Sequence, residues 1–480
     1  MIQALPTVGH PHDNCAICQA SSYYANTIGH FIIQQNPQAK GVFESWSREQ
    51  GNETSLMSNL QKNQELKDLV LDETPWLADA NREQEQKERL ADFFDENLMQ
   101  QRQNSSLDNL RHLQLADGSW SWWPGMDGSI YMTVEVSEML VRLNQMTTTQ
   151  DATKQMLTRA FDYMGKEMVK MVDEMKKDAK KGWKPTFPSH MVLQWLYICA
   201  LDGRQLPANV KEANNYLIRL LKKETTNQSI YDKAMSAIVL NNKTYVRSLK
   251  EYTVYREDMG RYYDTNRALY SWRDYRIPTQ VAAIEAIKRL TPEDTKTIEE
   301  MQRWLLQEKR TQAWDTPVNS ADAIYAFLSE KGKVKSAKFA AAPHTVLKVD
   351  GNEIETSKAT AGIGYVKTTM SGDNKQTFTA EKTSTGTSWG AVYMQYMQPV
   401  SDIEAQNSGI KVTREILSAE ANSIPDVPSP TRSLSLFTIH SSFSVGDRIK
   451  VRITIEADRD YDFVQVVDKR AACMEPVNTG

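Results

Sequence analysis

The chain has 480 residues, of which 40% are hydrophobic and 25% are charged. These fractions exclude a wholly disordered or fibrous protein, and the length suits roughly two to four folded domains. The 57 Lys and Arg residues nearly balance the 61 Asp and Glu residues, which leaves a net charge of -4. Because this balance provides no basic field for a polyanion, we expect no nucleic acid partner.

The sequence carries no sign of its own membrane attachment. It has no stretch of the roughly 18 to 20 consecutive apolar residues that a membrane span needs. Residues 1–11 also lack the charged start and apolar core of a signal peptide. We therefore expect either a cytoplasmic protein or a piece of a longer exported one. Four cysteines are too few for a disulfide scaffold in a chain of this length.

Two of the cysteines, Cys15 and Cys18, form a Cys-x-x-Cys pair with His10 and His12 just upstream. Such a set could bind zinc or act as a redox dithiol. It lacks the separated ligand pairs of a tetrahedral zinc site, and a redox pair is typical of a βαβ setting. Residues 16–28 instead have helical spacing of small and apolar residues. We therefore expect two semi-buried thiols on a helix, and no metal.

Four aspartates could carry chemistry of another kind. Asp92 and Asp95 lie three residues apart and could share a helix face, as acidic patches do in toroid cyclases that act on isoprenoids. Asp117 and Asp127 flank a tryptophan cluster and could form the acid and base of a glycosidase. The Asp-Gly turn explains Asp117 equally well. Because no complete catalytic set appears, we expect no catalytic residue and no cofactor.

The segment from Gln114 to Trp120 ends in Asp-Gly-Ser-Trp. It resembles the Gln-Trp element of α/α-toroid proteins, in which the Trp ring packs over helix ends and the Gln amide binds their backbone groups. Aromatic rings with a polar edge continue beyond it and suit a partly wet surface. We define the aromatic loop, a candidate interaction surface, by these rings: Trp120, Trp122, Trp123 and Tyr131. The same rings could instead plug one end of the helical region.

Apolar residues recur every three or four positions between Thr147 and Lys180, with charged residues between them. This spacing predicts a long amphipathic helix, which Gly182 ends. Its many methionines could line an adaptable groove, but core packing is the simpler explanation.

Loops rich in Pro, Gly and aromatic residues lead into four further helical patterns. These patterns predict helices over residues 129–143, 189–201, 279–290 and 319–328. The loops recur at intervals that suit helical hairpins of about 40 to 50 residues, stacked as an open solenoid or a closed ring. The Gln-Trp element favours a ring of about ten to twelve helices. Trp195 and Trp304 lie on apolar stripes, so we expect both to be buried.

The composition changes near residue 335, and from about residue 340 apolar and polar residues alternate. This alternation predicts strands over residues 345–349, 391–397, 450–455 and 463–467, separated by turn sequences. The fold class is therefore multi-domain α + β. We expect an α/α toroid of helical hairpins over residues 1–335, followed by an antiparallel β-sandwich over residues 336–480.

Three stretches together resemble the C-terminal region of bacterial α2-macroglobulin-family proteins. They are residues 12–26, residues 117–120 with 128–133, and residues 445–476. The resemblance implies a thioester-type toroid followed by a macroglobulin β-sandwich that is incomplete at its end. It also implies peptidase trapping in the periplasm or outer cell envelope, with a lipid anchor outside this chain. The implied partners are peptidases and the other domains of the full-length protein.

The active thioester motif of that family is Cys-x-Glu-Gln. If Gln19 is the Gln, then Ala16 stands at the Cys position and Cys18 at the Glu position, while Cys15 is four residues before the Gln. We therefore expect no working thioester and a non-covalent inhibitor. The alternative function is an α/α-toroid enzyme that acts on isoprenoids or polysaccharides through the four aspartates.

Overall fold

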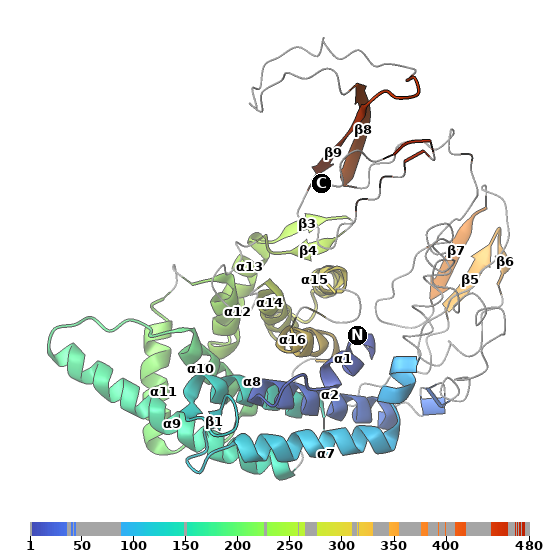
Figure 1. Cartoon of the computed structure of the whole chain (residues 1–480). Helices are drawn as coiled ribbons and strands as arrows, with labels where there is room; N and C mark the ends of the chain where they lie inside the picture. Colours follow the sequence, from blue (N-terminus) through green and yellow to red (C-terminus); the bar gives the residue numbers. More distant parts are fainter. Residues whose placement is uncertain are drawn as a thin grey trace. The chain divides into compact units, whose positions relative to one another are not determined.

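A computed structural model of the chain (Figure 1) divides it into two compact units, residues 1–390 and 391–480, and each is described here by itself. The structure describes residues 2–35, 40–41, 43–44, 88–147, 151–224, 228–257, 259–264, 276–309, 314, 316–329, 345–354, 376–382, 392, 399, 409–418, 443–458, 466, 468, 470–471 and 473–475.

The first unit is mainly helical (Figure 1). Its described helices include the short η1 (Ile2–Ala4), α1 (Leu5–Gly9), α2 (Ala16–Gln35), α7 (Glu96–Leu113), α8 (Ile130–Met146), α9 (Asp151–Lys180), α10 (His190–Asp202), α11 (Ala208–Leu221), α12 (Ile230–Val239), α13 (Lys243–Glu251), α14 (Arg276–Leu290), α15 (Thr295–Gln307) and α16 (Pro317–Leu328). The long helix predicted from the methionine-rich stripe is confirmed as α9. The four helices predicted after the loops are confirmed as α8, α10, α14 and α16.

Local sequence explains where several of these helices begin and end. The Ser129 hydroxyl accepts a hydrogen bond from the Met132 N–H and so caps α8, and Thr316 caps α16 just before Pro317. At the end of α9, Gly182 has a φ of 99°, a left-handed conformation that glycine adopts at little cost. The Trp183 N–H then donates to the Asp178 carbonyl, which completes a Schellman ending.

Six described helices contact one another in a cycle. In order these are α2, α8, α10, α12, α14 and α16, and α16 in turn contacts both α2 and α8. The helices α7, α9, α13 and α15 alternate with them along the chain, and each contacts a helix of the cycle. Every residue of α8 from Met132 to Leu143 is buried, whereas α15 buries a single stripe made of Thr297, Ile298, Met301, Trp304 and Leu305. The cycle therefore forms the interior, and α15 is amphipathic. None of the described helices is long and apolar enough to cross a membrane.

The described strands of the first unit form small antiparallel sheets. They pair as β1 (Trp120–Ser121) with β2 (Gly128–Ser129), β3 (Val254–Arg256) with β4 (Gly260–Tyr262), and β5 (Thr345–Val349) with both β6 (Asn352–Glu353) and β7 (Phe378–Lys382). The strand predicted over residues 345–349 is confirmed as β5. Asp350 and Gly351, with φ values of 48° and 81°, make the tight turn from β5 to β6.

In the second unit, β8 (Ile410–Ser418) pairs antiparallel with β9 (Ile449–Ala457) along their full lengths, from Ile410 opposite Ala457 to Ser418 opposite Ile449. The strand predicted over residues 450–455 therefore lies within β9. The strands predicted over residues 391–397 and 463–467 fall outside the described residues, apart from Val392 and Val466.

Candidate functional site

Residues 15–19, which the resemblance aligns with a thioester motif and which we call the thioester-equivalent segment, lie at the beginning of α2. Cys15 immediately precedes the helix, and its carbonyl accepts the Gln19 N–H at 3.0 Å, which closes the first turn. The Ala16 N–H donates to the Trp122 carbonyl at 3.0 Å. This bond joins the two regions that the sequence singled out, the thioester-equivalent segment and the aromatic loop, although a hundred residues separate them in the chain.

Within the aromatic loop, Trp120 differs from the other rings because it is fully buried. Its ring N–H donates to the Leu110 carbonyl at 3.0 Å, and its backbone N–H donates to the Thr133 hydroxyl at 2.9 Å. Trp120 therefore covers the end of α7 and joins it to α8. An exposed surface must come from the other rings of the loop.

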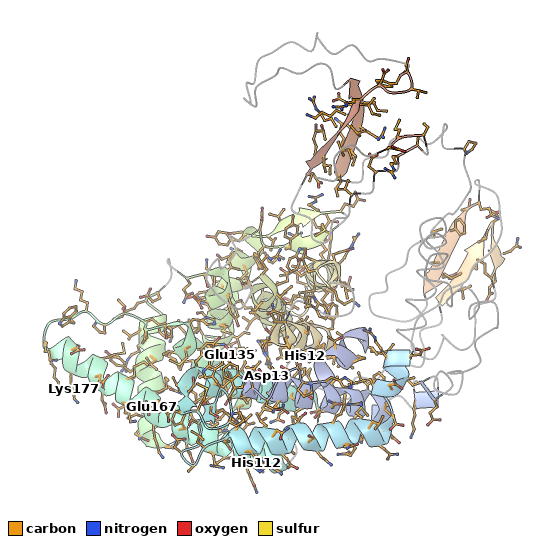
Figure 2. The ribbon with its side chains drawn as sticks, in the orientation of Figure 1. His12, Asp13, His112, Glu135, Glu167 and Lys177 are labelled. Carbon is orange, nitrogen blue, oxygen red and sulfur yellow. The ribbon has the colours of Figure 1, made fainter. Side chains whose placement is uncertain are left out.

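Those other rings form a stack. Trp122 lies with its ring centroid 6.0 Å from that of Trp123 and 5.8 Å from that of Tyr131. Trp123 is the exposed member, with 42% of its surface accessible. Its ring N–H donates to the Asp13 carboxylate at 3.0 Å, and Asp13 belongs to the segment before α2 (Figure 2). The stack and the thioester-equivalent segment therefore form one continuous site.

Gln19, which the resemblance aligns with the thioester Gln, is almost fully buried. Its side-chain amide donates to the Asp13 carbonyl at 3.1 Å, and its side-chain oxygen accepts from the Asn109 amide at 3.3 Å. The nitrogen and the oxygen of the Gln19 carboxamide are therefore both hydrogen bonded. The Gln19 side chain fixes the loop before α2 and ties it to α7.

The two cysteines of this segment lie closer together than the sequence suggested. Their sulfur atoms are 2.6 Å apart, and the Cys18 N–H donates to the Cys15 sulfur at 3.2 Å. The thiol and N–H of Cys18 favour the Cys15 thiolate and lower the pKa of Cys15 to about 7. The same contact raises the pKa of Cys18 above its ordinary value. The sequence predicts two semi-buried thiols on a helix. Both thiols are half-buried and Cys18 lies in α2, but Cys15 precedes the helix.

The upstream histidine His10 places Nδ1 2.7 Å from the Pro6 carbonyl oxygen, so this nitrogen is engaged within the chain. His12 is exposed. Over the part of the chain that the structure describes, no group of three or more His, Cys, Asp or Glu side chains is arranged to hold a metal ion.

Two of the four suggested acidic residues, Asp95 and Asp117, bind groups in their own local segments. The helical residues described just before α7 end at Phe93, so the prediction that Asp92 and Asp95 share a helix face is wrong. Asp95 instead caps α7, where its carboxylate accepts from the Leu98 N–H at 2.9 Å. Asp117 accepts from the Ser119 hydroxyl at 2.6 Å and the Ser119 N–H at 3.0 Å, and these bonds lower the pKa of Asp117. Asp127 is exposed on the loop between β1 and β2.

Gln114 has the contacts expected of a Gln-Trp element. Its side-chain amide donates to the Gly118 carbonyl at 3.0 Å and to the Met156 carbonyl of α9 at 2.9 Å. Gly118 has a φ of 97°, and a Cβ atom there would lie 2.2 Å from the Arg159 carbonyl oxygen. Only glycine allows the turn to approach α9 this closely.

A second copy of this arrangement was missed by the sequence analysis. The Trp314 ring N–H donates to the Leu305 carbonyl of α15 just before α16, as Trp120 does to α7 just before α8. The Gln280 amide donates to the carbonyls of Arg261 and Met301. Trp314 lies in one of the predicted repeat loops, which was the available signal. Gln280 escaped notice because it follows the turn that it binds, whereas Gln114 precedes its turn.

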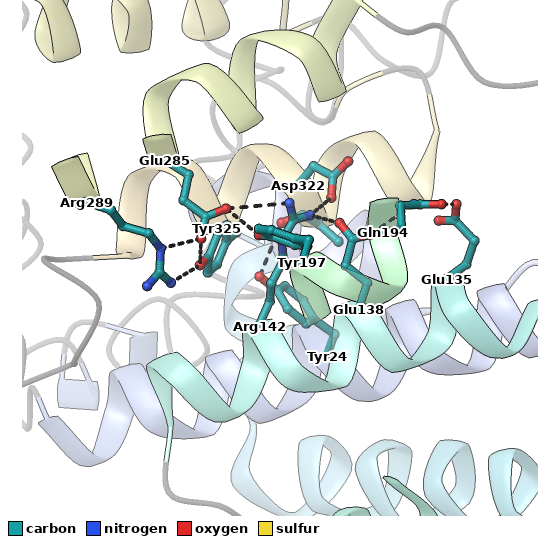
Figure 3. Close-up of polar contacts among 11 residues, drawn as sticks. Tyr24, Glu135, Glu138, Arg142, Gln194, Tyr197, Glu285, Arg289, Asp322 and Tyr325 are labelled. Carbon is teal, nitrogen blue, oxygen red and sulfur yellow. Dashed lines mark hydrogen bonds and ion pairs between the residues drawn. The ribbon is translucent and has the colours of Figure 1, made fainter. Parts of the chain in front are cut away.

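A buried charge network was also missed (Figure 3). Arg142 of α8 forms ion pairs with Glu138 at 2.8 Å and with Asp322 of α16 at 2.7 Å. Its Nε–H donates to the Tyr197 hydroxyl of α10 at 3.0 Å, and Tyr197 donates in turn to Glu285 of α14. These four helices of the cycle are therefore linked through one buried guanidinium. The available signal was a Glu and an Arg four residues apart in a helix of mainly apolar residues.

Glu285 shows how the network holds charge in the interior. Burial alone would raise the pKa of this carboxyl, but Arg289, Arg142 and the hydroxyls of Tyr197 and Tyr325 outweigh burial, so its pKa is lowered. Glu285 accepts from Arg289 at 2.7 Å and from Tyr325 at 2.7 Å. Its carboxylate is therefore ionised and bound on several sides, an arrangement that suits a structural role.

The second unit contains a match to a known protein family. Residues 409–480 match the Bacterial Alpha-2-macroglobulin MG10 domain family. A macroglobulin-type domain is therefore present, and it contains β8, β9 and the stretch over residues 445–476 that resembled this family. No curated protein matches the chain.

Proposed function

We propose that the chain is part of an α2-macroglobulin-like peptidase inhibitor that works without a thioester. The observation that carries this proposal is the MG10 match over residues 409–480. The same family resemblance supports an exported protein in the periplasm or outer cell envelope, anchored through a part outside this chain. Its partners would be peptidases and the other domains of the full-length protein.

The proposed architecture is an α/α toroid followed by a macroglobulin β-sandwich. The cycle of contacts from α2 to α16 and back to α2 supports the toroid. The two Trp elements, each of which covers the end of a helix that alternates with the cycle, support it as well. The antiparallel pair of β8 and β9 supports the sandwich.

The contacts of Gln19 support non-covalent action. A thioester joins a cysteine sulfur to the carbonyl carbon of the Gln side chain. The residue three positions before Gln19 is Ala16, which has no sulfur, and both polar atoms of the Gln19 carboxamide are hydrogen bonded. The sulfur of Cys15 contacts the sulfur of Cys18 and not Gln19.

We propose the aromatic loop as the surface that meets a peptidase. Trp and Tyr residues are enriched among the residues that dominate protein interfaces, because a large rigid ring is buried at little entropic cost. Trp123 is exposed and has Trp122 and Tyr131 stacked behind it. Trp183, which is 74% exposed and lies outside the stack, provides a matched control.

The test is to mix the chain with endopeptidases of the serine, cysteine, aspartic and metallo classes and to separate complexes by size. We expect a complex with at least one class that dissociates in denaturing detergent. Trp123→Ala should weaken this complex and Trp183→Ala should not. A complex that survives denaturation would contradict non-covalent action. The absence of any complex would contradict direct contact between this chain and a peptidase.

A further inference from the structure

The pair formed by Cys15 and Cys18 has a geometry that the proposed inhibitory function does not use. Their sulfur atoms, at 2.6 Å, are only about 0.5 Å farther apart than the atoms of a disulfide bond. Both residues are half-buried, so a small reagent can approach them. We propose that this pair is a thiol–disulfide exchange site, in which Cys15 attacks a disulfide and Cys18 completes the exchange.

The surroundings of Cys15 make it the attacking group. It lies at the N-terminus of α2, a helix of 20 residues, where N–H groups without partners in the helix point outward and favour a thiolate. The Cys18 N–H donates to its sulfur at 3.2 Å. Asp13 is the charged group that opposes the thiolate. Its carboxylate accepts hydrogen bonds from Trp123 and from the Asn14 N–H. The outcome is a Cys15 thiol with a pKa of about 7.

Cys18 is suited to the second step. In the reduced pair the Cys18 sulfur lies 2.6 Å from the Cys15 sulfur, and this contact raises the pKa of Cys18, so Cys18 keeps its proton. Once Cys15 has become part of a mixed disulfide, it no longer carries the negative charge that opposes ionisation of Cys18. Cys18 can then lose its proton beside the bond that it must attack.

The oxidant in this reaction is a small-molecule or protein disulfide, written RSSR. The Cys15 thiolate attacks one sulfur of RSSR, a Cys15–SR bond forms, the S–S bond of RSSR breaks, and one RS⁻ leaves. Cys18 then releases its proton to solvent and attacks the Cys15 sulfur. The Cys15–Cys18 disulfide forms and the second RS⁻ leaves. The cysteine pair loses two electrons, which reduce RSSR to two thiolates.

The experiment uses the full chain with Cys199→Ser and Cys473→Ser, so that only the pair remains. After reduction and exposure to oxidised glutathione at pH 7, intact mass should show the loss of two hydrogens and no retained glutathione. Adding Cys18→Ser should trap one glutathione on Cys15. Adding Cys15→Ser instead should slow the reaction of Cys18 by at least about tenfold, because the low-pKa thiol has been removed.

Two outcomes would overturn the proposal. One is the accumulation of glutathione on both cysteines without an internal disulfide. The other is an equal rate of adduct formation in the two single-cysteine chains. A second measurement follows the rate of Cys15 alkylation in the reduced pair as a function of pH. A midpoint near the Cys15 pKa of about 7 is expected, and a midpoint near 9.0, the value of an ordinary thiol, would contradict the assignment of Cys15 as the attacking group.

The mass and alkylation measurements report on the cysteines alone, so they can fail independently of peptidase binding.

Discussion

The Arg142 network and the aromatic loop both combine polar groups with large aromatic rings, but their surroundings differ. The Arg142 side chain is 4% exposed and pairs with carboxylates from three helices of the cycle. Trp123 is 42% exposed and binds one carboxylate from the segment before α2. Water can replace a partner lost from the loop, whereas a partner lost from the network leaves a charge buried. The comparison separates residues that hold helices together from residues that can meet another protein.

The largest effect is expected from Arg142→Met. This change leaves Glu138, Glu285 and Asp322 without their shared cation, and breaking a buried ion pair typically costs about 3 to 5 kcal/mol. The free energy of unfolding, measured by urea denaturation with circular dichroism, should fall by that amount. Arg111→Met removes a surface pair with Asp108 and serves as the control, with an expected loss below about 1 kcal/mol. Similar losses of unfolding free energy for the two variants would contradict the conclusion that the buried ion pairs stabilise the fold more than the surface pair does.

Buried and exposed tryptophans should differ in the same way in their effect on stability. Trp195 and Trp304 are buried, as the sequence predicted, and Trp195 also donates to Asn214 at 2.8 Å. Replacement of either by Ala should lower the free energy of unfolding by about 3 to 5 kcal/mol. Trp123→Ala should cost less than about 1 kcal/mol, since that ring is largely solvated. A large loss of stability from Trp123→Ala would show that the stack supports the fold and is not a free surface.

The smallest effect concerns pH. Hydrogen bonds from Ser119 hold the pKa of Asp117 below its ordinary value of 3.8. Because the folded pKa is depressed, Asp117 adds stability above the ordinary pKa, and this contribution is lost as the pH falls through the folded pKa. The difference in Tm between the wild-type protein and Asp117→Asn should therefore narrow from pH 7 toward about pH 2. Asp127→Asn, on the loop between β1 and β2, controls for the loss of one surface charge. A Tm difference between the wild-type protein and Asp117→Asn that stays constant with pH would contradict the lowered pKa of Asp117.

Features that depend on local pattern were predictable from the sequence. The apolar spacing located α9 and the helices after the repeat loops, and alternation located β5 and part of β9. The Arg142 network was not predictable, because Arg142 and Asp322 are 180 residues apart and only the packing of α8 against α16 brings them together. The Cys15 and Cys18 contact depends on the backbone just before α2, which spacing alone does not specify. Asp95 was misassigned because capping and sharing a helix face use the same residue type.

The proposal that this chain, which contains a macroglobulin-type domain, acts without a thioester is tested most directly by intact mass with and without methylamine. Methylamine opens a thioester by adding to the Gln carbonyl carbon and releasing a cysteine thiol. Freshly purified protein should show no change in mass, because the residue three positions before Gln19 is Ala16, which has no sulfur, and both polar atoms of the Gln19 carboxamide are hydrogen bonded. A gain of one methylamine that maps to Gln19, with the release of one thiol, would contradict the account.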